Sequence, residues 1–224
     1  MRQRGVRIVP SVLSVDLLRL RERVEAVAAG GADWIHVDVM DGHFVPNLTF
    51  GAPVIAAIRR ITDLPIDVHL MVERPERFID AFADAGASVF TFHPEATHHV
   101  QRQLHAVRER GMLAGLALNP GSPLAYAAEV VNDLDLLLVM TVNPGFPAQK
   151  FIPASIGKIS RARALLAEHG SGACLEVDGG ISRDTIAAVH AAGADTFVAG
   201  SAVFSADDPA GEVQELRKRC LTVV

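Results

Sequence analysis

The sequence predicts a single-domain (β/α)8 TIM barrel, because strand-like and helix-like segments alternate eight times along the chain. Parallel strands need long crossover connections, and the intervening helices supply them. A glycine-containing joint between helix and strand also recurs, beginning at Ala28, Ala83 and His190. No linker, low-complexity tract or shift in composition divides the chain. We therefore expect one barrel domain over residues 1–224.

Eight segments have the length and the apolar or β-branched composition of buried strands. Helical periodicity separates them, as over 16–30, where apolar positions recur every three or four residues. Pro75 and Ser182 stand where helices are expected to begin. The recurring glycines are typical of the left-handed residue that ends a helix. The predicted strands span residues 6–14, 34–40, 66–72, 88–93, 113–119, 134–142, 174–179 and 196–200.

Composition excludes several classes of protein. The 224 residues are 50% hydrophobic, which suffices for a full core, yet no apolar run is long enough to span a membrane. The net charge of −5 argues against a nucleic-acid groove. Cys174 and Cys220 have no metal or redox spacing. The N-terminal segment has no signal-peptide pattern, so we expect a cytoplasmic protein.

Polar side chains share one face of three predicted strands. Side chains alternate along a strand, so His36 and Asp38 lie on one face of 34–40 and apolar residues on the other. His69 and Asp178 have comparable positions on 66–72 and 174–179. The apolar faces should meet the helices, which directs the polar faces into the barrel near the C-terminal strand ends. Barrel enzymes build their active sites at that end.

Two histidines and two carboxylates that converge on one mouth favour a divalent metal ion. Zn²⁺ fits best by ligand type, and Fe²⁺, Mn²⁺ or Co²⁺ accept the same set. His36 and Asp38 alone would more simply be a hydrogen-bonded core pair, but His69 and Asp178 in register favour the metal site. Asp38 and Asp178 could also face each other across a substrate, where one removes a proton and the other delivers one.

Three glycine-bearing loops follow the last three predicted strands. Glycine permits close backbone approach, and exposed N–H groups can hold an anion, so these loops predict a phosphate site. The alternative is three ordinary turns. The loops contain Gly145 after strand 134–142, Gly179 and Gly180 after strand 174–179, and Gly200 and Ser201 after strand 196–200.

The chain closely resembles the ribulose-phosphate 3-epimerase family from "PSVLSVD" (10–16) to "FVAGSAVF" (197–204). The most specific motifs are "HVDVMDGHFVPNLTFG", "DVHLMVERP", "TFHPEA", "VNPGF" and "LEVDGGI". The resemblance implies a metal-dependent barrel that interconverts D-ribulose 5-phosphate and D-xylulose 5-phosphate through a 2,3-enediolate. It also implies a homo-oligomer, a dimer or a hexamer.

Site roles follow from the resemblance for several residues. The metal ligands map to His36, Asp38, His69 and Asp178, and the two acid/base groups to Asp38 and Asp178. Substrate contacts map to Ser11, His69, Met40, Met71 and Met140, of which the three methionines correspond to a sulfur-lined wall. The role of His93 stays open between support of the metal site and a core hydrogen bond. Asp67 and Glu176 are expected deeper in the barrel, where they either orient the metal histidines or form salt bridges with a buried Lys or Arg.

One loop departs from the family pattern Gly-Phe-Gly-Gly-Gln. Here it reads Gly145-Phe146-Pro147-Ala148-Gln149. Pro147 has no N–H to donate, and Ala148 disfavours a positive φ. The phosphate would then depend more on Gly179, Gly180, Gly200 and Ser201, or the loop would admit a related substrate such as allulose 6-phosphate. Outside this chemistry, the rival hypotheses are a metal-dependent hydrolase and a non-catalytic sugar-phosphate binder.

Overall fold

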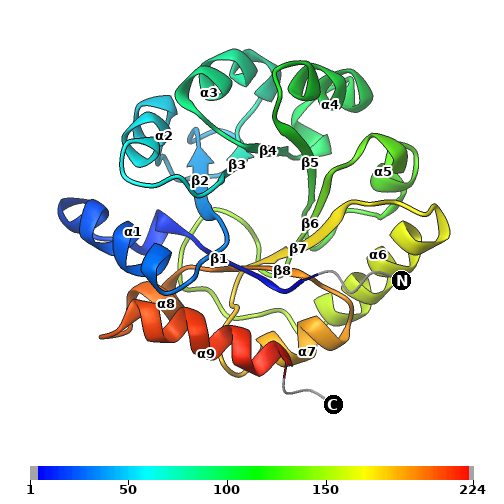
Figure 1. The fold of residues 1–224 in the computed structure, drawn as a ribbon. Coiled ribbons are helices and arrows are strands. Elements are labelled where there is room, and N and C mark those ends of the chain that lie inside the picture. Colours follow the sequence, from blue (N-terminus) through cyan, green and yellow to red (C-terminus); the bar gives the residue numbers. More distant parts are fainter. Residues whose placement is uncertain (1–4, 222–224) are drawn as a thin grey trace.

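The eight predicted strands are all present and form a parallel barrel with helices outside (Figure 1). The structure, a computed structural model, describes residues 5–221. The predicted domain over 1–224 therefore includes residues 1–4 and 222–224, which lie outside the described residues. The strands are β1 (Arg7–Pro10), β2 (Ile35–Met40), β3 (Ile66–Met71), β4 (Val89–Phe92), β5 (Leu113–Leu118), β6 (Leu136–Met140), β7 (Cys174–Asp178) and β8 (Thr196–Ala199).

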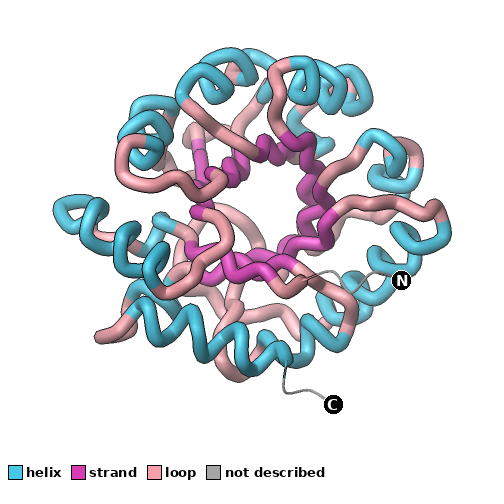
Figure 2. Tube along the Cα trace, viewed as in Figure 1, coloured by secondary structure: helices cyan, strands magenta, loops and turns pink. Residues whose placement is uncertain are grey.

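The strands follow the order β1-β8-β7-β6-β5-β4-β3-β2, and a parallel bridge between Ser11 and His36 joins the two ends of the sheet. Figure 2 shows the resulting ring of strands inside the helices. The helices are α1 (Leu20–Ala29), α2 (Ala52–Arg59), α3 (Ile79–Ala85), α4 (Val100–Glu109), α5 (Ala125–Ala128), α6 (Ser155–Glu168), α7 (Ile186–Ala191), α8 (Ser201–Phe204) and α9 (Pro209–Leu221).

Strand boundaries agree with the prediction within two residues, except at the end of the first strand. The α-helices expected from residue 16 and from Pro75 begin at Leu20 and Ile79, each after a 3₁₀ turn. The first strand ends at Pro10 rather than Ser14, because residues 12–14 form a 3₁₀ turn whose start Ser11 caps by accepting from the Leu13 N–H. The helix predicted to start at Ser182 begins at Ile186 instead. The Ser182 hydroxyl accepts from the Asp184 N–H, which makes a local turn before the helix.

Within residues 5–221, the buried hydrophobic side chains form two main clusters and a small third one made of Met40, Val45 and Met71. Outward-facing strand residues such as Ile35, Val37 and Val39 belong to the large cluster that packs against the helices. Val9, Leu138 and Val198 belong to a second, smaller cluster of buried strand residues. Many of the buried polar side chains come from three strands: His36 and Asp38 of β2, Asp67 and His69 of β3, and Glu176 of β7.

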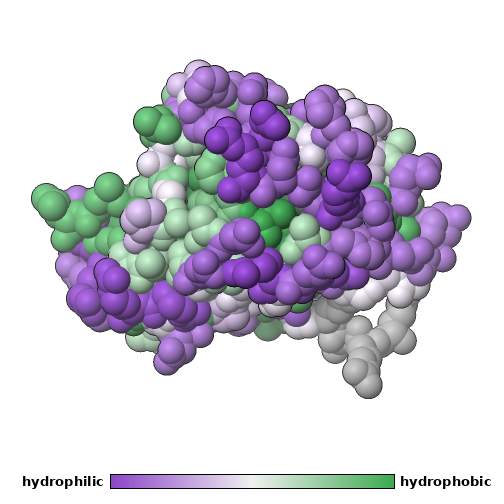
Figure 3. Space-filling view, turned by 90° about the horizontal axis from the view of Figure 1, so that it is seen from above, coloured by the Kyte–Doolittle hydropathy of each residue, from purple (hydrophilic) through white to green (hydrophobic). Residues whose placement is uncertain are grey.

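The face in Figure 3 is largely hydrophilic, with hydrophobic side chains at its left end and near its centre. Among the described residues, the large hydrophobic side chains that remain exposed include Leu17, Leu18 and Leu48. Within residues 5–221, no helix is both long and apolar enough to cross a membrane.

Candidate metal centre and active site

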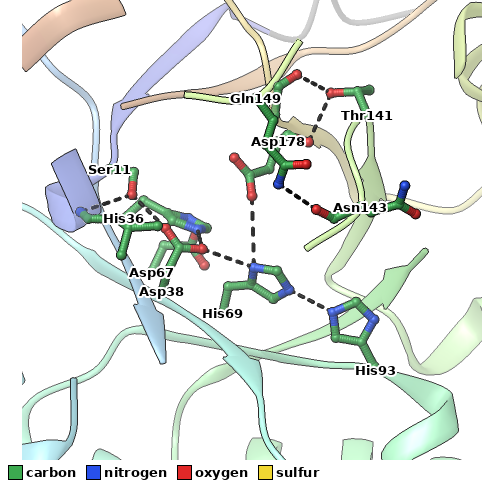
Figure 4. A network of polar contacts seen from close by, with 12 residues as sticks. Ser11, His36, Asp38, Asp67, His69, His93, Thr141, Asn143, Gln149 and Asp178 are labelled. Carbon is green, nitrogen blue, oxygen red and sulfur yellow. Dashed lines mark hydrogen bonds and ion pairs between the residues drawn. The ribbon is translucent and has the colours of Figure 1, made fainter. Parts of the chain in front are cut away.

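Four side chains from three strands meet at the C-terminal mouth of the barrel. One ligand atom each from His36, Asp38, His69 and Asp178 lies within 4.8 Å of the other three. The His36 Nε2 and His69 Nδ1 atoms are each 3.3 Å from Asp38 Oδ1, and His69 Nδ1 is 3.9 Å from Asp178 Oδ2. Figure 4 shows the His69 ring with Asp38 and Asp178 on one side and His93 on the other. The predicted convergence of these four residues is therefore present.

The donor set fits one divalent cation. Ligand atoms about 2.1 Å from a tetrahedral ion are about 3.4 Å apart, close to the shorter separations in this cluster. The two imidazoles are fully buried, Asp38 is nearly so, and Asp178 is partly exposed to the mouth. Such a cluster of buried carboxylates and imidazoles is costly without a counter-charge. This buried His/Asp cluster could bind one metal ion.

A second acidic residue, Asp67, contacts the Nδ1 atom of His36, whereas Nε2 faces Asp38. The His36 Nδ1 atom lies 2.6 Å from Asp67 Oδ2, and both side chains are fully buried. A carboxylate on the far nitrogen of a ligand imidazole fixes the ring and its tautomer. Glu176 also lies close to His36. One oxygen of Asp67, one oxygen of Glu176 and one ring nitrogen of His36 all lie within 4.8 Å of one another. Neither Glu176 oxygen has a hydrogen-bond partner among the described residues.

The two aspartates differ in their affinity for protons. Burial alone would raise the pKa of Asp38, but the charges and hydrogen bonds of His36 and His69 hold it well below its usual value. Burial and then the negative charge of Asp38 raise the pKa of Asp178 to about 6. One carboxylate is thus kept ionised while the other gains a proton readily, which suits a pair of opposite proton-transfer roles.

A cleft opens directly above the cluster. His36 and His69 are not among its lining residues, because they lie beneath its floor, whereas Asp38 and Asp178 reach it. The role of His69 as a substrate contact stays a prediction. All the other residues predicted as substrate contacts line the cleft: Ser11, Met40, Met71, Met140, Gly145, Phe146, Pro147, Ala148, Gly179, Gly180, Gly200 and Ser201.

The loop that departs from the family pattern closes one side of this cleft. Ala148 has a φ of +57°, so it adopts the left-handed conformation that alanine disfavours. The Gln149 side-chain amide donates to the Asn143 and Phe146 carbonyls, and the Asn47 amide donates to the Gly145 carbonyl. The hydrogen bonds from Gln149, within the loop, and from Asn47, outside it, stabilise this backbone conformation.

Several cleft residues were not predicted. Val142 and Val198 have strand-end positions on inward faces, which the alternation rule could have identified. Gln149 follows the predicted loop residues, and its amide hydrogen bonds have no sequence signal of their own. The remaining unpredicted lining residues are Leu13, Ser14, Pro144 and Ile181.

The chain is similar in sequence to one family of known proteins. Residues 7–204 match the model of the Ribulose-phosphate 3 epimerase family. The chain is 52% identical to Ribulose-phosphate 3-epimerase 1 of Cupriavidus necator, over 93% of this chain and 88% of that protein. It is 48% identical to the Ribulose-phosphate 3-epimerase of Escherichia coli, over 96% of each.

A solved structure with lower sequence identity has the same fold. The 3-hexulose-6-phosphate synthase of Salmonella typhimurium superposes with a TM-score of 0.74 at 21% identity, over 96% of this chain and 98% of that chain. At this identity the likeness concerns the barrel alone.

Proposed function

The chain belongs to the ribulose-phosphate 3-epimerase family, and we propose that it inverts C3 of a pentulose phosphate with Asp38 and Asp178 as its two acid/base groups. It is a carbohydrate epimerase. The observation that carries the proposed residue roles is the meeting of two carboxylates, from β2 and β7, in one buried cluster beneath the cleft. The substrates proposed are D-ribulose 5-phosphate and D-xylulose 5-phosphate.

In this mechanism each aspartate serves one face of the substrate. The ionised Asp38 carboxylate removes the proton from C3, and its electron pair forms the C2–C3 double bond of a 2,3-enediolate. Protonated Asp178 then delivers its proton to the opposite face of C3, so the stereocentre inverts and the C2 carbonyl re-forms. Asp38 ends protonated and Asp178 ionised, and the reverse reaction exchanges these roles. The opposed pKa shifts of the two groups support this assignment.

His36, Asp38, His69 and Asp178 would hold the metal ion, and we propose Zn²⁺ because two imidazoles and two carboxylates suit it. When bound, a divalent cation supplies positive charge that acidifies the substrate C–H and stabilises negative charge on the neighbouring oxygens. Met40, Met71 and Met140 line the cleft, and no more than 2% of the surface of each residue is exposed. They exclude water from the reacting carbons and offer no competing proton donor.

The phosphate group is proposed to bind between the loops after β6, β7 and β8. Gly179, Gly180 and Gly200 line the cleft there together with Ser201, the first residue of α8. A hexulose phosphate is the alternative substrate, favoured only if the altered loop at Pro147 and Ala148 admits a longer chain. Comparing kcat/KM for ribulose 5-phosphate and allulose 6-phosphate separates the two, and a preference for the hexulose would overturn the pentulose assignment.

We also propose a cytoplasmic homo-oligomer. Exposed Leu17, Leu18 and Leu48 support burial against a second copy, and the two cysteines form no disulfide, as expected in a reducing compartment. Light scattering during gel filtration measures the mass, and a monomer at micromolar concentration would contradict the oligomer.

Solvent exchange tests the reaction directly. In D₂O, purified protein loaded with Zn²⁺ is expected to introduce deuterium at C3 of ribulose 5-phosphate while xylulose 5-phosphate forms and no bond is cleaved. The Asp38→Asn and Asp178→Asn variants should lose turnover by orders of magnitude while still folding. A hydrolase would instead release a cleavage product. A non-catalytic binder would give no exchange, and either result would refute the proposal.

A further inference from the structure

His93 stands directly behind His69, on the side away from the metal centre. The two Nε2 atoms are 2.8 Å apart, and both side chains are fully buried. The rings lie with centroids 5.0 Å apart and tilted by 39°. A contact this short between two ring nitrogens is a hydrogen bond only if one nitrogen carries a proton and the other does not.

The position of His69 Nδ1 determines the direction of that hydrogen bond. Nδ1 faces the Asp38 and Asp178 carboxylates, so its lone pair must be free if the ring is to bind a cation there. The His69 proton then sits on Nε2 and is donated to His93. It follows that His93 has a bare Nε2 and carries its own proton on Nδ1.

The surroundings of His93 favour this tautomer. Its Nδ1 has no hydrogen-bond partner among residues 5–221, and the Glu95 Oε2 atom is 3.9 Å away, where a carboxylate attracts an N–H dipole. The ring of Phe44 packs on the ring of His93, with centroids 4.8 Å apart.

Glu95 is fixed in turn by the loop after β5. Its Oε1 atom accepts from the Asn119 amide and from the Ser122 hydroxyl. The buried Lys158 ammonium of α6 donates to the carbonyls of Asn119 and Ser122. A continuous set of polar contacts therefore runs from α6 through this loop, Glu95 and His93 to His69.

We propose that His93 is a positioning residue that fixes His69 in the tautomer whose Nδ1 is free to bind the metal ion. The proposal rests on the proposed role of His69 as a ligand. A hydrogen-bond acceptor behind a ligand imidazole holds the ring orientation and raises its basicity, and loss of such a partner commonly weakens metal binding by about 10- to 100-fold.

Nitrogen-15 NMR of the histidine rings tests the tautomer without any activity measurement. In the Zn²⁺-loaded wild-type protein, His93 should show a protonated Nδ1 and an unprotonated Nε2, with its signals assigned by their loss in His93→Gln. A His93 ring protonated on Nε2 could not accept from His69 and would overturn the proposal. This measurement needs no variant to be active, so it decides even if the buried site tolerates substitution poorly.

Zn²⁺ affinity, measured by competition with a chelator, tests the consequence. We expect His93→Leu to bind Zn²⁺ about 10- to 100-fold more weakly than wild type, and His93→Gln, whose amide oxygen can accept from His69, to remain within about threefold. His105→Leu, on exposed α4, is the matched control and should leave affinity unchanged. Equal affinities in all variants, or equal losses in the Leu and Gln variants, would refute the positioning role.

The His69→Ala variant distinguishes this proposal from the proposed function. If His69→Ala binds Zn²⁺ as tightly as wild type, then His69 is not a ligand and the metal centre itself was assigned wrongly. If His69→Ala loses Zn²⁺ while both His93 variants keep it, only the role of His93 fails.

Discussion

The Ser11 hydroxyl donates a hydrogen bond of 2.6 Å to Asp38 Oδ2, and both side chains are buried at the floor of the cleft. This serine also bridges to His36 across the join of the barrel. The contact therefore connects barrel closure to the carboxylate that we assign as a base. It stabilises the ionised form of Asp38, because a hydroxyl donates more strongly to a carboxylate than to a carboxylic acid.

Replacing Ser11 by alanine should lower kcat/KM by roughly 10- to 100-fold, since a hydrogen bond to a charged group contributes about 1.5–3 kcal/mol. Steady-state kinetics measure the effect, with Ser160→Ala, at an exposed position of α6, as the control. An unchanged kcat/KM in Ser11→Ala would contradict a contribution of this hydrogen bond to the reaction.

Asp178 should make the stability of the metal-free protein depend on pH. Burial and the charge of Asp38 raise its pKa to about 6, from an ordinary value of 3.8. Between these pH values the folded chain holds more protons at Asp178 than the unfolded chain, so its contribution to stability falls as the pH rises. The ionised form costs the fold about 3 kcal/mol above pH 6.

The variant Asp178→Asn should therefore be more stable than wild type above pH 6 when metal is absent, and the difference should shrink toward pH 4. Urea unfolding at several pH values with a chelator present measures the difference in the free energy of unfolding. Asp184→Asn, at an exposed carboxylate in the following loop, provides the control. A difference that stays constant from pH 4 to pH 8 is incompatible with the raised pKa.

Two glycines with nearly the same φ should respond very differently to alanine. Gly180 has a φ of +65°, and a Cβ there would lie 2.6 Å from the Phe151 backbone nitrogen. Gly170 has a φ of +62°, and a Cβ there would meet nothing within 4 Å. Gly170→Ala should lower the free energy of unfolding by about 1 kcal/mol, because alanine disfavours the left-handed conformation. Gly180→Ala adds a clash with the backbone and should lower it by about 3 kcal/mol.

Urea denaturation gives both free energies, and the kinetic parameters give a second readout. Gly180→Ala should also raise KM, because relief of its clash displaces the loop that contains Phe151 beside the proposed phosphate site. If the two variants lose equal stability, the backbone contact at Gly180 does not constrain the loop.

Pro147 should weaken binding of the phosphate group because it contributes no N–H to the cleft that it lines. Pro147→Gly restores that donor, and one added hydrogen bond of about 1 kcal/mol should lower KM for ribulose 5-phosphate about fivefold with kcat nearly unchanged. Pro123→Gly, in the loop before α5, controls for the general effect of losing a proline. An unchanged or higher KM would mean that residue 147 does not approach the phosphate.

The sequence predicted the positions of site residues best where side chains alternate regularly along a strand. Alternation along β2 placed His36 and Asp38 on the inward face, and the same rule on β3 and β7 placed His69 and Asp178 there, as the structure shows. The period of two is a property of the backbone, so tertiary context cannot change it once a strand forms. The alternation of strands and helices predicted the barrel, because parallel strands need helical crossover connections.

These rules could not predict contacts between residues that are remote in sequence. Sequence reasoning left His93 and Asp67 between two roles, because only the pairing of β2 with β3 and of β3 with β4 decides which ring nitrogen each one meets. Local competition explains the misplaced boundaries at Ser11 and Ser182, since both hydroxyls accept from nearby N–H groups and make turns. The left-handed conformation of Ala148 opposes its own propensity and is imposed by its loop.

The ligand cluster draws on both halves of the polypeptide, with His36, Asp38 and His69 in the first half and Asp178 near the end. During translation the first three emerge from the ribosome long before the fourth. The cluster is therefore complete only after β7 has joined the sheet, and a nascent chain has no finished pocket with which to capture an ion. A metal ion held by these four residues would therefore be acquired late, and a chain truncated before Asp178 would lack one of the four ligands that we propose.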